Sequence, residues 1–479
     1  MGSDLKKKTI HGVLWSAFDN FGSTAISFIF GILLARILSP GDYGLTAMIA
    51  VFLGISRIFI ESGFSNALIR KPDLKDDDCC TAFYFNLLIA IGCYIILFFT
   101  APLIAQFYNK SILCPLVRAE ALCLIINSLI LVQIALVNRQ IDFKFTSKVN
   151  LSSSIISGIV GTLFALYGFG VWSLVFLDIS NSLVALSFYW INSKWKPHLV
   201  FSKKSFHYLF GYGSKLLATG ILDVIFQNLY PIIIGKFYSS ASLGYYTKAT
   251  NFAKFPSSTL TNVIQRVTFP VLSTIQDENQ RLVEDYRRLL RMSAFIIFPL
   301  MVGLAAIAKP LIVLLLTNKW EQCAIYLQLL CFSMMLYPIH SLNLNLLQVK
   351  GRTDLFLKAE IIKRIIQILI VIFTVRYGIV IMCIGLIANS YIALIINTYY
   401  TGILIKVGFW VQLKDLYLIF LNSIAMGGIA YYISSLFCTN ILSIVGAVIS
   451  GFASYILFSY ICKLEELKEL TAFVKKRKY

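Results

Sequence analysis

The chain has 479 residues, of which 58% are hydrophobic and only 14% are charged, and it carries a formal net charge of +19 at pH 7. A soluble protein of this length needs far more charged residues to cover its surface, so the composition excludes an ordinary soluble domain. The apolar runs are long and continuous rather than alternating, which argues against transmembrane strands. The expected fold class is therefore an all-α polytopic membrane protein.

The N-terminal segment resembles a secretory signal peptide only superficially. Lys6, Lys7 and Lys8 precede an apolar stretch, but that stretch runs past Leu38 and contains Asp19. The apolar region of a signal peptide is much shorter and leads to a small-residue cleavage site. We therefore interpret this segment as the first membrane span.

Apolar runs separated by charged breaks predict about fourteen spans along the chain, each of roughly 20 residues. They lie near residues 12–38, 43–65, 80–102, 114–137, 149–167, 171–192, 212–236, 242–265, 290–316, 323–347, 358–376, 379–402, 415–434 and 440–462.

Basic residues are distributed very unevenly over the connections between these spans. On the side of the two termini there are 31 Lys and Arg residues, whereas the opposite side has four, namely Lys110, Lys309, Lys319 and Arg376. By the positive-inside rule, both termini are expected in the cytoplasm of a multi-pass protein of the bacterial inner membrane. The net positive charge thus reflects topology and a preference for anionic membrane lipids, and it does not indicate nucleic-acid binding.

The ten cysteines form no CxxC motif, and most of them lie inside apolar runs. Cysteines in that setting behave as small hydrophobic residues. We expect neither a disulfide framework nor a metal site, and no motif indicates a cofactor.

Two halves of the chain show a weak internal repeat. At an offset of 200 residues, Arg36–Gly44 (RILSPGDYG) matches Lys236–Gly244 (KFYSSASLG). At an offset of 208–210, further short matches follow in the same order, such as Tyr167-Gly168 with Tyr377-Gly378. Six spans separate the copies, so both copies have the same orientation, as in parallel repeats that frame a central cavity.

The repeat predicts two six-helix lobes followed by two further helices. The expected organisation is an N-terminal lobe (1–192), a cytoplasmic interfacial linker (193–211), a C-terminal lobe (212–402), two additional helices (403–462) and a cytoplasmic basic tail (463–479).

Polar residues form stripes on the first spans of both lobes. Asp19, Ser23 and Ser27 recur every four residues in the first span, and so share one helix face. The seventh span has the same spacing at Lys215, Thr219, Asp223 and Gln227, and the two stripes superpose at the 200-residue offset. Ionisable residues inside a bilayer usually face a cavity or a partner, so the two stripes predict a shared binding site.

Further polar residues in the second, eighth and tenth spans extend this site. Cations are expected to bind an anionic headgroup such as a diphosphate, and buried acids are candidates for coupling to H⁺ or Na⁺. The candidate binding residues are Arg57, Lys215, Lys248, Arg266, Asn251 and Gln227. The candidate coupling residues are Asp19, Glu61, Asp223 and His340.

Structural interpretations of several of these residues stay open. Arg57 and Glu61 are four residues apart, a spacing at which two opposite charges can simply neutralise each other. Lys215 and Arg266 lie near span ends, where long side chains reach the interface. His340 is also compatible with a hydrogen-bonded histidine of the helix bundle.

Two blocks carry a resemblance to a known family. Ala35–Arg70 (ARILSPGDYGLTAMIAVFLGISRIFIESGFSNALIR) and Leu243–Asp277 (LGYYTKATNFAKFPSSTLTNVIQRVTFPVLSTIQD) closely resemble the polysaccharide-transport, or Wzx-like, branch of the multidrug/oligosaccharidyl-lipid/polysaccharide exporter superfamily. The resemblance implies a flippase that moves an undecaprenyl-diphosphate-linked oligosaccharide by alternating access, for surface polysaccharide biosynthesis. It also implies that cations in the first two helices of each lobe engage the diphosphate, here Arg57, Lys215, Lys248 and Arg266. Other polysaccharide-assembly membrane proteins are then candidate partners.

Two other functions compete with this interpretation. A drug or metabolite antiporter of the same superfamily would favour a smaller, more apolar cavity with few cations. A membrane polymerase or ligase usually needs a large periplasmic loop with catalytic Arg or His, whereas the predicted outer connections are short and poor in charge. No catalytic motif is present, so we expect a transporter rather than an enzyme.

Overall fold

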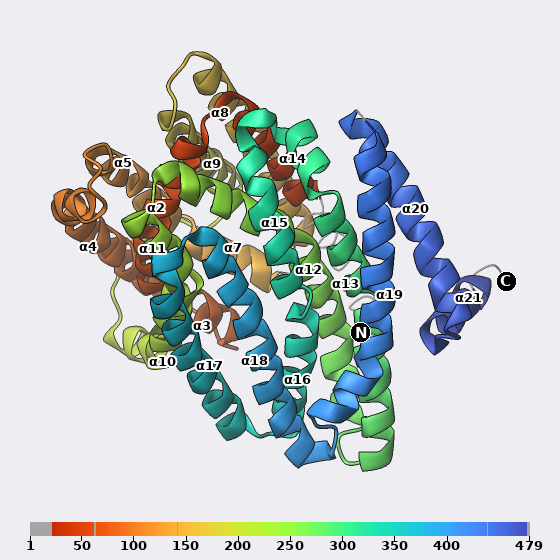
Figure 1. The fold of residues 1–479 in the computed structure, drawn as a ribbon. Helices are drawn as coiled ribbons and strands as arrows, with labels where there is room; N and C mark the ends of the chain where they lie inside the picture. Colours follow the sequence, from red (N-terminus) through yellow and green to blue (C-terminus); the bar gives the residue numbers. More distant parts are fainter. Residues whose placement is uncertain (1–21, 62–63, 141, 438, 477–479) are drawn as a thin grey trace. The chain divides into compact units, whose positions relative to one another are not determined.

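The computed structural model describes residues 22–61, 64–140, 142–437 and 439–476 (Figure 1). Within these ranges every element of regular secondary structure is a helix, which confirms the predicted all-α fold class. The chain divides into two compact units, Met1–Gly244 and Tyr245–Tyr479, and each is described by itself.

The first unit contains a helix at Gly22–Ile37 and the labelled helices that follow it. They are α2 (Pro40–Glu61), α3 (Phe64–Arg70), α4 (Asp76–Tyr108), α5 (Leu113–Glu120), α6 (Leu122–Ser128), α7 (Leu131–Arg139), α8 (Phe143–Leu166), α9 (Trp172–Asn192), α10 (Lys203–Gln227) and α11 (Leu229–Phe237).

The long helix α12 (Ser240–Thr274) begins in the first unit and continues into the second. The elements after it are α13 (Asn279–Ala306), α14 (Ala308–Leu316), η1 (Asn318–Trp320), α15 (Glu321–Met334), α16 (Tyr337–Val349), α17 (Thr353–Thr374), η2 (Val375–Tyr377), α18 (Ile379–Ile405), α19 (Phe409–Leu436), α20 (Asn440–Ile461) and α21 (Glu465–Lys476).

Nine helical segments of the described chain are long and apolar enough to cross a membrane, and the number is eleven if each of two bent helix pairs is counted as one span. The three remaining predicted spans correspond to the helix Gly22–Ile37, α12 and α17. The described part of the first is short, and the other two carry several charged residues, such as Lys248 in α12 and Lys363 in α17. The multi-pass architecture is confirmed, and the number fourteen stays a prediction.

The connection between α9 and α10 is fixed to the start of α4. Trp195 donates its indole N–H to Asp76 at 2.5 Å, and the backbone N–H of Ser202 donates to the Thr81 hydroxyl at 3.0 Å. The Ser202 hydroxyl then accepts from the backbone N–H of Ser205 and caps α10, which begins at Lys203. The predicted linker is thus non-helical up to Ser202 and helical beyond it.

The seventh predicted span, which α10 and α11 form, packs with the first compact unit. Gly54 and Gly220 are the points of close approach, because a side chain on them would meet Val224 and Ile58 respectively. The predicted domain boundaries follow the sequence repeat rather than compactness, and they stay a prediction.

Positions 40 and 44 meet positions 240 and 244, which are their predicted equivalents. A Cβ on Gly44 would coincide with the carbonyl of Ser240, and a Cβ on Gly244 would coincide with the carbonyl of Pro40. Only glycine allows two helix starts to approach so closely. The contact is thus reciprocal between positions that the sequence repeat predicts to be equivalent.

The C-terminal helix α21 is held against α13 by ion pairs within the second unit. Arg288 Nε lies 2.9 Å from Glu469, and Arg291 Nε lies 2.9 Å from Glu466. The side chain of Glu466 is nearly inaccessible. The basic tail is therefore helical from Glu465 to Lys476, and its residues Glu466 and Glu469 hold it against α13.

Candidate functional site

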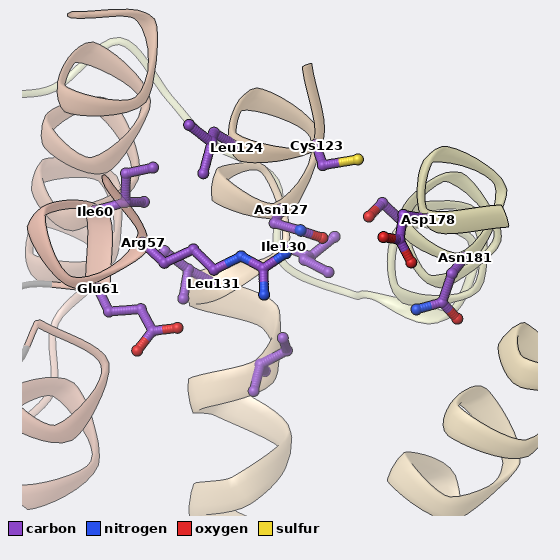
Figure 2. Close-up of a pocket in the computed structure, with 12 residues that line it drawn as sticks. Arg57, Ile60, Glu61, Cys123, Leu124, Asn127, Ile130, Leu131, Asp178 and Asn181 are labelled. Carbon is purple, nitrogen blue, oxygen red and sulfur yellow. The ribbon is translucent and has the colours of Figure 1, made fainter. Parts of the chain in front are cut away.

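A cavity of about 300 Å³ lies inside the first unit, between α2, the broken α5–α7 segment and α9 (Figure 2). It is lined by Arg57, Ile60, Glu61, Cys123, Leu124, Asn127, Ile130, Leu131, Ile134, Asp178, Asn181 and Ser182. Its volume lies at the lower end of the range of small-molecule pockets.

The broken helix creates one wall of this cavity. The axis of Leu113–Ser128 is bent by 41° from that of Leu131–Arg139, and no Pro or Gly lies between Ala121 and Leu131. At the bend, the Ser128 hydroxyl donates to the Ile125 carbonyl at 2.8 Å, and Trp190 donates its indole N–H to the Leu129 carbonyl at 3.1 Å. Such a kink is possible because side-chain donors, rather than helix N–H groups, bind these backbone carbonyls. The kink places Ile130 and Leu131 in the lining of the cavity.

Arg57 extends into the cavity and makes no close ion pair with Glu61, although its charge acts on that carboxyl group. Figure 2 shows its side chain directed from α2 toward Asn127, whereas the Glu61 carboxylate lies apart. Both residues are described and exposed to the cavity, and no ion pair joins them. The geometry therefore disfavours the interpretation that the two charges form a simple neutralising pair.

A buried acid that we did not single out from the sequence stands beside this cavity. Glu120, the last residue of α5, is only 5% exposed, and its Oε2 has no hydrogen-bond partner within the described ranges of the chain. Its carboxyl group adjoins that of Asp178 on α9, and the charge of Arg57 acts on both. Glu120 is an ionisable residue within a predicted span, which is itself a signal of function that the sequence offered.

Acids outnumber bases around this cavity. One guanidinium, that of Arg57, faces the carboxyl groups of Glu61, Asp178 and Glu120. An anionic group that binds Arg57 must therefore compete with nearby carboxylates, unless these bind protons or a cation. The cavity combines one anion-binding group with a set of acids.

None of the other first-unit candidates whose side chains are described lines the Arg57 cavity. Asp19 is outside the described residues, as is the side chain of Lys215, although the backbone there belongs to α10. Asp223 and Gln227 are exposed on α10, and neither lines the Arg57 cavity.

The candidate binding residues of α12 lie at two separate places along this helix. Lys248 is half-buried next to Cys323 of α15, and Asn251 is exposed one turn further on. Arg266 is eighteen residues beyond Lys248, which corresponds to ~27 Å along a helix axis. Lys248 and Asn251 can therefore serve one ligand group, and Arg266 cannot reach the same group.

His340 is held by hydrogen bonds on both ring nitrogens. Its Nε2 lies 3.1 Å from the Ser390 hydroxyl, and its Nδ1 lies 3.3 Å from the Asn397 amide. Ser390 in turn donates to the Ser333 carbonyl at 2.9 Å. This geometry favours the structural interpretation of His340 over a role in ion coupling.

A buried amide network lies one turn from His340. Gln412 and Asn343 exchange hydrogen bonds at 3.0 and 3.1 Å, and Gln412 also donates to Thr401 at 3.1 Å. These side chains are at most 1% exposed, so the network fixes α16, α18 and α19 together. Among the described residues, no group of three or more His, Cys, Asp or Glu side chains could hold a metal ion.

Residues 33–325 match the family model described as "Polysaccharide biosynthesis protein". The chain belongs to this family. It is 26% identical over 365 residues to the lipopolysaccharide biosynthesis protein WzxC of Escherichia coli strain K12, covering 75% of this chain and 73% of that protein. It is 25% identical over 356 residues to the teichuronic acid biosynthesis protein TuaB of Bacillus subtilis strain 168, covering 73% of each.

The fold of this family member is also that of a solved transporter. The lipid II flippase MurJ, in its inward closed conformation, superposes with a TM-score of 0.75 at 20% identity, over 94% of this chain and 98% of that one. At this identity the likeness establishes the fold. The predicted resemblance to the polysaccharide-transport branch is confirmed by the family match and by these relatives.

Proposed function

We propose that this chain is a flippase that moves an undecaprenyl-diphosphate-linked oligosaccharide across the bacterial inner membrane for surface polysaccharide biosynthesis. The observation that carries the proposal is the Arg57 cavity, in which a guanidinium without an ion pair to Glu61 faces an open polar space inside a bundle of apolar helices. A guanidinium at such a place suits a diphosphate, because it can donate two parallel hydrogen bonds.

The names of two relatives support this proposal. WzxC and TuaB are named for lipopolysaccharide and teichuronic acid biosynthesis, which are different surface polymers. Related proteins that serve such different polymers are expected to act on the part that the polymer precursors share. A lipid diphosphate carrier is such a part. The substrate enters from the cytoplasm, and alternating access releases it on the other side.

In this proposal the acidic residues of the cavity affect how the substrate binds. A diphosphate brings at least two negative charges beside Asp178, Glu120 and Glu61, so its binding requires that protons or a cation come with it. We propose that these acids link substrate binding to H⁺ or Na⁺. Both termini are proposed to lie in the cytoplasm, from the distribution of basic residues.

The competing functions fit the cavity less well. A drug antiporter needs a mainly apolar pocket. Here five of the twelve lining residues have a charged or amide side chain, namely Arg57, Glu61, Asp178, Asn127 and Asn181. A polymerase or ligase needs a catalytic constellation, and the cavity presents no nucleophile paired with a base.

Replacement of Arg57 tests the proposal. In a strain that lacks the chromosomal gene, Arg57→Ala is expected to abolish restoration of the surface polysaccharide, and Arg57→Lys to restore it partly, because lysine keeps the charge but loses the paired donors. Arg281→Ala is the matched control, since this arginine is 62% exposed on α13. Immunoblots of membranes check that each variant inserts.

The proposal fails if Arg57→Ala restores wild-type levels of polysaccharide while it is inserted normally. The same experiment with Lys248→Ala asks whether the second unit also contributes a cation.

A further inference from the structure

A second cavity of the first unit, of about 370 Å³, has a different chemistry. It lies between the helix Gly22–Ile37, α8 and α9, and its lining side chains are all uncharged. Most carry a hydroxyl or an amide, among them Ser27, Asn150, Ser153, Ser154 and Asn181. We refer to this cavity as the neutral groove.

Close helix packing builds the neutral groove. A side chain at Gly158 of α8 would overlap the ring of Phe30, and one at Gly161 would press against Leu177 of α9. These small residues bring α8 against both neighbouring helices. The polar side chains therefore stand on three helices that pack directly on one another, rather than on a mobile loop.

One hydroxyl of the groove has no partner among the described residues. Ser153 is only 3% exposed, and its Oγ makes no hydrogen bond to any group in the part of the chain that the structure describes. Leaving a buried hydroxyl unpaired is unfavourable, so such a group usually has a ligand or a water as its partner. Because Ser153 lines the groove, that partner is expected to occupy the groove.

The neutral groove adjoins the Arg57 cavity along α9. Asn181 lines both cavities, and Asp178, one turn earlier on α9, lines the charged one. A ligand that reaches from one cavity to the other thus passes from a charged site to a site of uncharged donors and acceptors. A lipid-linked saccharide has the same order of chemistry, because a diphosphate is followed by sugar hydroxyls.

We propose that the neutral groove binds the first sugar of the substrate, an uncharged hydroxylated sugar attached directly to the diphosphate. This assignment rests on the proposed flippase function. Serine hydroxyls and asparagine amides both donate and accept hydrogen bonds, so they match hydroxyl groups that do the same. The nearby carboxyl of Asp178 disfavours an acidic sugar at this position.

The test compares two lipids on the purified full-length protein in lipid nanodiscs. The first is undecaprenyl diphosphate, and the second is the lipid-linked saccharide extracted from cells that lack this protein. The wild type is expected to bind the second lipid more tightly, because only that lipid fills the groove. Asn150→Leu combined with Ser154→Leu places apolar groups in the groove and leaves the Arg57 cavity unchanged.

The double variant is expected to weaken binding of the saccharide lipid about tenfold, as expected for the loss of two hydrogen bonds. Its affinity for undecaprenyl diphosphate is expected to stay within about twofold of the wild type. Ser187→Leu is the matched control, since Ser187 is exposed on α9 and lines neither cavity.

Three results would overturn the sugar site. A double variant that binds the saccharide lipid as tightly as the wild type shows that the groove makes no contact with the sugar, and water alone then fills the groove. An equal loss of both affinities in the double variant shows a structural effect, which a thermal unfolding curve of the same sample detects. If the wild type binds neither lipid, the flippase proposal itself fails, and the sugar site fails with it.

Discussion

Arg57 differs from Arg118, another arginine of the first unit, in what its side chain contacts. Arg118, by comparison, donates to the Phe98 carbonyl at 3.2 Å and lies over the Phe98 ring, so its charge is used within the protein. Arg57 instead faces open space with carboxyl groups on two sides. The guanidinium of Arg57 is therefore accessible to an anion, and the neighbouring carboxylates compete with that anion for it.

Removal of one competing acid should strengthen anion binding. Asp178→Asn keeps the shape of the side chain and removes a negative charge near Arg57, so it is expected to raise the affinity for undecaprenyl diphosphate by about three- to tenfold at low salt. Lipid binding in nanodiscs measures this change. Glu284→Gln, an exposed acid on α13, serves as the control. Unchanged or weaker binding by Asp178→Asn would show that the acid does not oppose the anion.

The sequence predicted part of this site for a clear physical reason. Arg57 and Glu61 are charges within an apolar run, and a charge in a span is conspicuous. Asp178 is likewise a charge within an apolar run. The neighbourhood of Glu120 and Asp178 was not predictable, because these residues are 58 positions apart and meet only when α5 and α9 pack together.

At the scale of elements, broken helices shape the first unit. Two predicted spans, near 114–137 and 212–236, are bent helix pairs with angles of 41° and 43°. Hydropathy predicts each pair as one span, since apolar character continues through the break. The break itself comes from tertiary contacts such as the Trp190 hydrogen bond to Leu129, and a local pattern cannot reveal these.

The reciprocal glycine contact is the most sterically demanding feature of the first unit. Gly44→Ala would place a methyl group on the Ser240 carbonyl, so α2 and α12 must separate at their N-terminal ends. We expect a loss of about 2 kcal/mol or more in the free energy of unfolding, the usual cost of overpacking. Unfolding by SDS titration in mixed micelles gives this value.

Gly41→Ala is a matched control in the same helix turn, because its Cβ would meet only serine hydroxyls at 3.5 Å, an ordinary contact. Equal stability of the two variants would contradict the close approach of α2 and α12.

At the scale of the whole chain, composition predicts the fold class. Continuous apolar runs predicted a polytopic all-α membrane protein, and the helices of the described residues confirm this fold class. The Gly44–Ser240 and Gly244–Pro40 contacts agree with the 200-residue offset. Hydropathy cannot settle the number of spans, because α12 and α17 combine the length of a span with charged residues.

Membrane topology is a testable property of the whole chain. Because basic residues concentrate on one side, a C-terminal fusion to green fluorescent protein is expected to fluoresce, and a C-terminal alkaline phosphatase fusion is expected to be inactive. A fusion at Lys110, between α4 and α5, should give the opposite result. An active phosphatase at the C-terminus would overturn the predicted topology.

The sidedness of the lipid-linked oligosaccharide in cells decides whether this protein is a flippase. In a strain that lacks the gene, we expect the complete oligosaccharide on its lipid carrier to accumulate in the cytoplasmic leaflet, where enzymes added to the outside of spheroplasts cannot reach it. Expression of the wild type should expose it on the periplasmic side, and Arg57→Ala should not. Accumulation on the periplasmic side of the deletion strain, or no accumulation at all, would contradict a role in translocation.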